Sequence, residues 1–188
     1  FPAAKKIVYR WSGQVMEPID SLAFIGRNPG DAENVYVVTG DSGNGMTHGV
    51  IAGLLISDLI LGGSNPWEKL YDPSRKTARA AVDFAKENLN VVIQYRDFLT
   101  AGDVATSRSI KRGEGAVLRD GLSKIAAYRD QDGTLHKMTA VCPHLKCIVR
   151  WNGAEKTWDC PCHGSRFDCL GNVMNGPATS SLEAVSTD

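Results

Sequence analysis

The chain has 188 residues, of which 43% are hydrophobic and 22% are charged. This composition is that of a globular protein and excludes collagen, a long coiled coil and a disordered chain. Its 21 Lys and Arg residues balance 21 Asp and Glu residues, so the basic excess of a nucleic-acid-binding protein is absent.

The most apolar stretch of the sequence covers residues 50–61 and includes Asp58. A membrane-spanning helix needs about 20 apolar residues, so we expect no membrane span and a cytoplasmic location. The N-terminus, FPAAKKIVYRW, lacks an initiator Met and the charged-then-apolar order of a signal peptide. We therefore expect the chain to be processed or to be a piece of a longer protein.

The first region, residues 1–74, has the pattern of an α/β fragment. Residues 35–38 form a short β-branched run that predicts a buried strand. A turn with four glycines follows, GDSGNGMTHG at residues 40–49. Residues 50–61 are apolar nearly all round, which predicts a helix packed on several sides. Two glycines at 62–63 are typical of the end of such a helix.

The second region, residues 75–102, has apolar side chains at alternating steps of four and three between positions 78 and 99. This spacing predicts an amphipathic helix, with Ser74 as its N-cap. We interpret the region as a helical linker.

The third region, residues 103–188, has short β-prone runs separated by Asp-Gly and Asn-Gly pairs. The runs cover residues 116–119, 125–128, 134–141, 148–151 and 156–158. Several short strands with such turns predict a small antiparallel β domain. The whole chain is therefore expected to have an α+β fold.

Four of the five cysteines and two of the four histidines lie in two short turns of this third region, CPHLKC and CPCHGS. Cys142 with His144, and Cys160 with His163, give the pattern C-x-H, fifteen residues, C-x-x-H. Each turn would supply one thiolate and one imidazole, which are both ligands of transition metals.

Zinc is one metal that such residues bind. Zinc sites with two Cys and two His usually pair like ligands, whereas each turn here mixes them. Two further cysteines, Cys147 and Cys162, lie in the same turns, and a single zinc ion does not need six such residues. A binuclear cluster together with a disulfide between the turns would use all six. A zinc-stabilised binding module stays open as the alternative.

The two turns resemble the cluster loops of Rieske [2Fe–2S] proteins, in which two His replace two Cys on one iron. The resemblance covers residues 103–188. It implies that Cys142 and Cys160 bind one iron and that His144 and His163 bind the other. Neutral imidazoles in place of thiolates raise the reduction potential, to about −150 to +300 mV in Rieske centres.

The same resemblance implies a disulfide between Cys147 and Cys162, which would tie the two loops together. Pro177, in the segment NGPA, looks like part of the proline loop that covers the cluster. Ser165 is similar to the serine that follows His-Gly in high-potential Rieske proteins, which carry a Tyr two residues later. This chain has Phe167 there, so we expect a potential below the highest Rieske values.

The first region resembles the C-terminal end of FAD-dependent amine or amino-acid oxidases of the glycine/D-amino-acid oxidase family. The similar segments are residues 20–49, with Trp67 and residues 71–75 as the continuation in members fused to a C-terminal Rieske domain. Backbone amides of the glycine turn could face an anion at a helix N-terminus. The resemblance implies FAD contacts by Gly43, Gly45, Met46 and Thr47.

The chain departs from this family in one respect. Such flavoproteins open with a strand and a G-x-G-x-x-G turn that holds the FAD pyrophosphate, and no such motif occurs here. FAD is therefore expected only in a full-length enzyme. Without the rest of its domain, the apolar helix at 50–61 would expose a hydrophobic patch. We expect it to pack against the Rieske domain or another copy of the chain.

These patterns predict a fragment of an FAD-dependent oxidoreductase domain at 1–74, a helical linker at 75–102 and a Rieske domain at 103–188. The expected function is one-electron transfer to or from an FAD that oxidises an amine or amino-acid-like substrate. The chain alone would be an electron-transfer module without catalytic residues, and its partner a flavin domain or redox protein. A free-standing Rieske ferredoxin for an oxygenase is the second interpretation, against which the additional cysteine pair counts.

Overall fold

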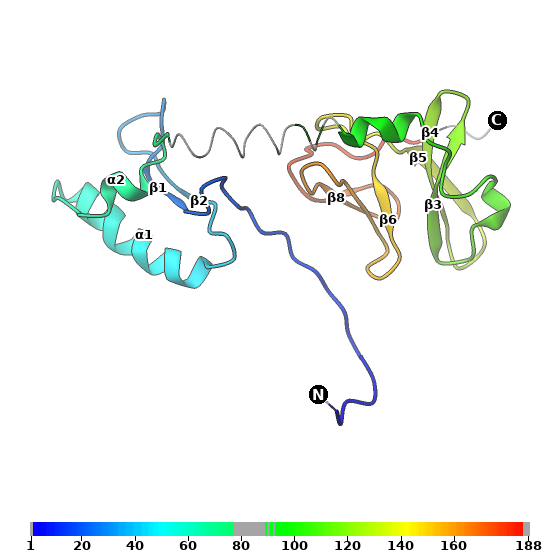
Figure 1. Ribbon diagram of the computed structural model, residues 1–188, viewed down its shortest axis with the longest axis horizontal. Coiled ribbons are helices and arrows are strands. Elements are labelled where there is room, and N and C mark those ends of the chain that lie inside the picture. The colour runs from blue at the N-terminus through cyan, green and yellow to red at the C-terminus, as the bar shows by residue number, and fades with distance from the viewer. Residues whose placement is uncertain (1, 77–88, 90, 92, 186–188) are drawn as a thin grey trace. The chain divides into compact units, whose positions relative to one another are not determined.

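The computed structural model describes residues 2–185 apart from 77–88, 90 and 92 (Figure 1). It divides the chain into an N-terminal unit, Gly13–Glu87, and a C-terminal unit of Phe1–Ser12 with Asn88–Asp188. Helices and small antiparallel sheets make up the described residues, which confirms the predicted α+β class. No helix among these residues is long and apolar enough to span a membrane.

The N-terminal unit is a β-hairpin with a helix packed against it. Its elements are strands β1 (Phe24–Arg27) and β2 (Tyr36–Thr39) and helices α1 (Gly45–Ile60) and α2 (Glu68–Tyr71). The two strands pair antiparallel, with Ile25 opposite Val38. Ile25 of β1 and Leu55 of α1 are fully buried and form a small core with Tyr71.

Two expectations about this unit are wrong. Helix α1 is packed on one face only, because Leu55 is buried whereas Val50 and Leu54 are more than half exposed. The strand at 35–38 is not buried either, since the side chain of Val38 is 49% exposed. A two-stranded sheet and one long helix leave one face of each uncovered. The exposed apolar patch expected from the sequence is present in the described residues.

The end of α1 follows the glycine signal in the sequence. Gly62 has a φ of 72°, which a residue without a Cβ adopts at little cost. Its N–H donates to the carbonyl of Leu59 at 3.3 Å, and the N–H of Gly63 donates to the carbonyl of Asp58 at 2.8 Å. These two bonds are the Schellman pattern that satisfies the last carbonyls of a helix.

Arg75 forms an ion pair that links the segment after α2 to the segment before β1. Its Nε and Nη2 atoms donate to the two oxygens of Asp20 at 2.8 and 2.9 Å, and the ion pair is mostly buried. The guanidinium also donates to the carbonyls of Leu22 and Ala23 and lies 4.0 Å from the centre of the Phe24 ring. The hydrogen bonds from Arg75 lower the pKa of the Asp20 carboxyl.

The C-terminal unit contains two antiparallel sheets. Its elements are the 3-10 helices η1 (Tyr95–Phe98) and η2 (Ser107–Ser109) and strands β3 (Glu114–Asp120), β4 (Ser123–Arg129), β5 (Leu135–Thr139), β6 (Arg150–Asn152), β7 (Thr157–Asp159), β8 (Arg166–Asp168) and β9 (Val173–Asn175). The first sheet has the order β3-β4-β5 and the second β6-β7-β8-β9. All five β-prone runs predicted in the third region overlap strands β3 to β7.

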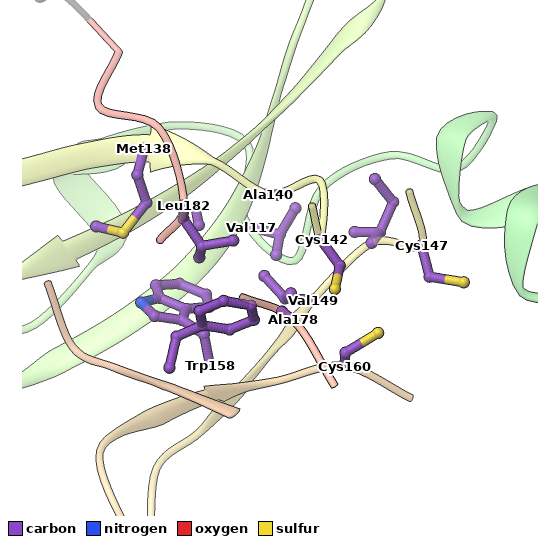
Figure 2. Packing of buried hydrophobic residues seen from close by; sticks show 13 residues of the cluster. Val117, Met138, Ala140, Cys142, Cys147, Val149, Trp158, Cys160, Ala178 and Leu182 are labelled. Atoms are coloured by element: carbon purple, nitrogen blue, oxygen red, sulfur yellow. The ribbon is translucent and has the colours of Figure 1, made fainter. Parts of the chain in front are cut away.

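One core joins the two sheets and extends to the loops between them (Figure 2). Val117 and Met138 come from the first sheet, and Trp158 comes from the second. Trp158 is fully buried, and Cys142 and Cys160 belong to the same cluster. The core thus supports the loops that carry the candidate metal ligands.

Half of the helical linker predicted at 75–102, namely residues 77–88, 90 and 92, lies outside the described residues. Of the described residues, 89, 91, 93 and 94 are α-helical, and the 3-10 turn η1 follows them directly. Arg150 in β6 donates to Asp97 in η1 at 2.8 Å and to Gln94 at 3.0 Å. This turn therefore packs on the second sheet.

The contribution of the Arg75–Asp20 ion pair to stability can be tested by hydrogen exchange of the β1 amides in the full chain. Arg75→Ala should lower the free energy of opening of β1 by about 2 kcal/mol, because a buried bidentate pair is lost. Arg75→Lys, which keeps the charge without the planar fork, should lose less. Because the pKa of Asp20 is lowered, the contribution of the pair is present above the ordinary Asp pKa and disappears as the pH falls through the lowered value. Unchanged exchange in Arg75→Ala would refute the role.

Candidate metal centre

Two six-residue loops, 142–147 and 160–165, carry the cysteine–histidine pattern and share one backbone conformation. In both loops the N–H of the first residue donates to the carbonyl of the sixth at 2.8 Å. In both loops the N–H of the fifth residue donates back to the carbonyl of the first at 3.0 Å. The fifth residue has a positive φ in each, 61° at Lys146 and 75° at Gly164. The two loops are therefore matched supports for one site.

Cys142 and Cys160 are the first residues of the loops, and both side chains are buried. Their thiols are hydrogen-bonded to each other. The bond from Cys160 lowers the pKa of the Cys142 thiol to about 6, whereas the bond to Cys142 and burial raise the pKa of Cys160. The two thiols therefore shift each other's pKa in opposite directions. Binding of a cation to both sulfurs would require both as thiolates, because thiolates are the metal-binding form.

His144 and His163 lie at the surface. Both residues are exposed, and their ring centres are 4.9 Å apart with planes at 88°. Burial of the ring, and then the nearby charge of His144, lower the pKa of His163. A lower pKa favours the neutral imidazole, which is the form that binds a metal.

The four candidate ligands therefore differ in burial: the two cysteines are buried, and the two histidines are exposed. This difference fits a [2Fe–2S] cluster that has thiolates on one iron and imidazoles on the other. A different group, Cys147, Cys160 and Cys162, has its sulfur atoms within 4.8 Å of one another. Two of those sulfurs are bonded to each other in a disulfide, so they offer no thiolate. The assignment of the four ligands stays a prediction, which this donor set supports.

The structure contains the disulfide between Cys147 and Cys162. It joins the sixth residue of the first loop to the third residue of the second, and their Cα atoms are 6.5 Å apart. Cys147 is buried in the same core cluster as Cys142. The disulfide therefore joins the two loops on the side that faces the buried core. The remaining thiol outside this group, Cys169, is free and partly buried.

Ser165 connects three loops through its hydroxyl group. The residue is fully buried, and its Oγ accepts a hydrogen bond from the N–H of Ala178 at 3.0 Å. Its hydroxyl also donates to the thiol of Cys142, which contributes to the low pKa of that thiol. Ala178 follows Pro177 in the third loop, where Pro177 is exposed. Ser165 thus links the expected proline loop to the candidate sulfur ligand.

Phe167 lies in β8, opposite Trp158 of β7. It is fully buried in the core cluster that includes Cys142 and Cys160. Its ring supplies packing but no hydrogen-bond donor. The expectation of a lower potential, which rests on this missing hydroxyl, stays a prediction.

Tyr95 was missed as a loop contact by reasoning from sequence. Its hydroxyl donates to the carbonyl of Leu145 in the first loop at 2.5 Å. The apolar spacing between positions 78 and 99 predicts that Tyr95 belongs to the apolar stripe of a helix. No local signal links it to residue 145, because the contact spans 50 positions.

The four residues expected to contact FAD lie together at the start of α1. Gly45 is the first residue of the helix, and Met46 is 92% exposed. Gly43 and Thr47 are also exposed. His48, one residue further, is buried and its Nδ1 lies 3.1 Å from the carbonyl oxygen of Asp41. The geometry leaves the four residues accessible, and their contact with FAD stays a prediction.

Comparison with known proteins identifies the class. The family model described as Rieske [2Fe-2S] domain matches residues 100–186, and the model described as FAD dependent oxidoreductase matches residues 1–59. The cytochrome b6-f complex iron-sulfur subunit of Trichodesmium erythraeum is 32% identical, over 76% of this chain and 74% of that subunit. The chain belongs to the Rieske [2Fe–2S] family, whose cluster transfers electrons.

A second relative extends the similarity to the N-terminal unit. YhfW of Bacillus subtilis, whose name describes a Rieske 2Fe-2S iron-sulfur protein, is 36% identical over 98% of this chain. The chain spans 36% of the length of YhfW. Among solved structures, the plasma membrane Rieske protein PetC3 of Synechocystis PCC 6803 is 27% identical, with a TM-score of 0.40, over 47% of this chain and 90% of that one.

The hydrogen bond from Ser165 should tune the reduction potential. Ser165→Ala removes a hydroxyl group beside a candidate ligand sulfur, and donors to cluster sulfurs favour the reduced, more negative cluster. We expect the potential to fall by about 60 mV, the equivalent of about 1.4 kcal/mol for one electron. Protein-film voltammetry measures it. Ser165→Thr, which keeps the hydroxyl, is the matched control, and an equal potential in the alanine variant would count against the bond.

Phe167→Tyr tests the opposite change, a rise in the reduction potential. A hydroxyl at this position is expected to add a donor near the cluster and to raise the potential. Voltammetry of the variant beside the parent protein gives the answer, with the iron content checked in both. A potential that is unchanged or lower would contradict the interpretation.

The disulfide makes a simple prediction for thiol chemistry. In the iron-loaded protein, only Cys169 should react with a thiol reagent under non-reducing conditions, or none if its partial burial protects it. Mass spectrometry of the alkylated protein identifies the sites. Alkylation of Cys147 or Cys162 in protein that retains its iron would show that the bridge is not required.

Proposed function

We propose that this chain is the C-terminal part of an FAD-dependent oxidoreductase in which a Rieske cluster exchanges electrons with the flavin. The observation that carries the proposal is that matches to an FAD dependent oxidoreductase family and to the Rieske family occur in one chain. The similarity to YhfW extends over both units and covers only a part of that longer protein. The N-terminal part of such an enzyme would supply the G-x-G-x-x-G turn that is absent here.

The N-terminal unit supports the proposal with an accessible helix N-terminus and an uncovered apolar face. The first backbone N–H groups of α1 have no partner within the helix and can donate to an anionic or carbonyl group. Gly43 has no side chain at this position, so a flat ligand could approach its backbone closely, whereas a Cβ at Gly45 would meet the carboxylate of Asp41 at 2.5 Å. The exposed apolar residues Met46, Val50 and Leu54 are suited to the rest of a flavin domain.

The C-terminal unit supplies the electron-transfer site. A bound [2Fe–2S] cluster would supply a one-electron couple. Cys142 and Cys160 would hold it on the buried side, where Ser165 donates to one sulfur. His144 and His163 would hold it at the surface, where a partner can approach and where a ring proton can be released.

The substrate of this proposed enzyme is an amine or an amino-acid-like molecule, and its location is the cytoplasm. The substrate class follows from the resemblance of the first region to amine and amino-acid oxidases. The residues that would bind the substrate belong to the N-terminal part of the enzyme. The chain's own contribution is to receive or deliver electrons one at a time.

The test is to isolate the full product of the reading frame that contains this sequence. We expect FAD in equal amount to the protein, together with about two iron and two acid-labile sulfide per chain. Anaerobic addition of amines and amino acids should bleach the flavin and then produce the signal of the reduced cluster in electron paramagnetic resonance. Iron and sulfide without flavin would favour a free-standing ferredoxin and reject the proposal.

Met46→Glu in that full product separates the two cofactors. The residue is 92% exposed in this chain, so the change should not disturb folding, but a negative charge next to the flavin should weaken FAD retention about tenfold. Leu122→Glu, at an 89% exposed position in the β3–β4 turn, is the matched control. We expect full iron content in both variants. Equal FAD content in both would argue against the assigned FAD contacts.

A further inference from the structure

Lys146 has a backbone conformation that favours glycine. Its φ is 61°, and the residue at the matched position of the second loop is Gly164, with a φ of 75°. The same two hydrogen bonds close both loops, so glycine satisfies this backbone geometry. A side chain with a Cβ is strained in the left-handed region. Such strain in a functional loop is a reason to ask what the side chain does.

The side chain of Lys146 has no internal role that explains the strain. The residue is exposed, and no described residue forms an ion pair or hydrogen bond with its ammonium group. Leu145 beside it is 47% exposed, and the candidate ligand His144 is two positions away. Among the described residues, the Lys146 ammonium group thus has no partner, and the residue lies two positions from the exposed candidate ligand His144.

The segments around the candidate metal centre carry positive charge and no negatively charged side chain. The two cluster loops, 142–147 and 160–165, and the segment 173–178, which begins with β9, contain Lys146 and no Asp or Glu. The chain as a whole has equal numbers of acidic and basic residues. A single unpaired cation beside an apolar side chain and two imidazoles is complementary to a surface that presents carboxylates around its own redox group.

We propose that Lys146 is an electrostatic docking residue that binds a carboxylate of an acidic electron-transfer protein next to His144. The inference rests on electron transfer through the cluster and adds the chemistry of the partner. Charges at the rim of an interface act mainly on the rate of association and on its salt dependence. The backbone strain at position 146 is the cost of placing a cation where glycine would otherwise be preferred.

The experiment uses the iron-loaded chain, reduced and freed of reductant, and follows its oxidation by ferricyanide in a stopped-flow instrument. Each event moves one electron from the reduced cluster to ferricyanide, which becomes ferrocyanide. Poly-L-glutamate serves as the model of a carboxylate surface. Lys146→Ala removes the charge and keeps a Cβ, Lys146→Arg keeps the charge, and Lys111→Ala removes an exposed charge outside these three segments.

At low ionic strength, Lys146→Ala should react with ferricyanide about fivefold more slowly than the parent, and the difference should disappear at high salt. Poly-L-glutamate should slow the parent and Lys146→Arg but not Lys146→Ala. Lys111→Ala should behave like the parent. Parent-like rates in Lys146→Ala, or an equal effect of Lys111→Ala, would overturn the proposal.

The strain is tested separately by comparing Lys146→Gly with Lys146→Ala, which differ in the Cβ alone. The glycine variant should have the higher thermal midpoint, because its backbone adopts a positive φ without strain. A lower midpoint would refute the argument from strain. The cluster signal in electron paramagnetic resonance, and its loss on addition of ferricyanide, report electron transfer in every variant. A failure of the docking claim is thereby distinguished from a failure of the electron-transfer site.

Discussion

The burial of Cys142 and Cys160 in one cluster is the constraint on which the candidate metal centre depends. The two residues come from different loops, and each shifts the pKa of the other's thiol, in opposite directions. Unpaired buried thiolates are unfavourable, so the site is stable only while both loops keep their relative position. The surrounding structure can be understood as a set of constraints that fix this position.

Four constraints hold the two sulfurs in place. Hydrogen bonds inside each loop give both loops the same backbone conformation, and the disulfide joins their lower parts. Ser165 then connects the second loop to the first loop and to the loop that contains Pro177. Beneath them, the fully buried Trp158 and Phe167 pack the two sheets together. Local turns, a covalent bond and a shared core therefore support one arrangement, with sulfur inside and imidazole outside.

The sequence predicts most of this site because its chemistry is concentrated in short motifs. The two cysteine–histidine turns and the Asx-Gly turns between strands are local signals, and the structure has the corresponding loops and strands. The sequence does not predict strands β8 and β9, each of which has only three residues. The contact of Tyr95 with the first loop depends on tertiary packing, which no local pattern encodes. The burial of α1 was overestimated because an all-round apolar helix indicates a partner surface, which these described residues do not provide.

Electron paramagnetic resonance of the reduced chain, with its histidines labelled with ¹⁵N, tests the central claim most directly. Our account predicts a [2Fe–2S] signal with magnetic coupling to two imidazole nitrogens, one from His144 and one from His163. Replacing either histidine with alanine should remove one coupling or prevent cluster assembly. A signal without nitrogen coupling, or a preparation that contains one zinc and no iron, would contradict the claim.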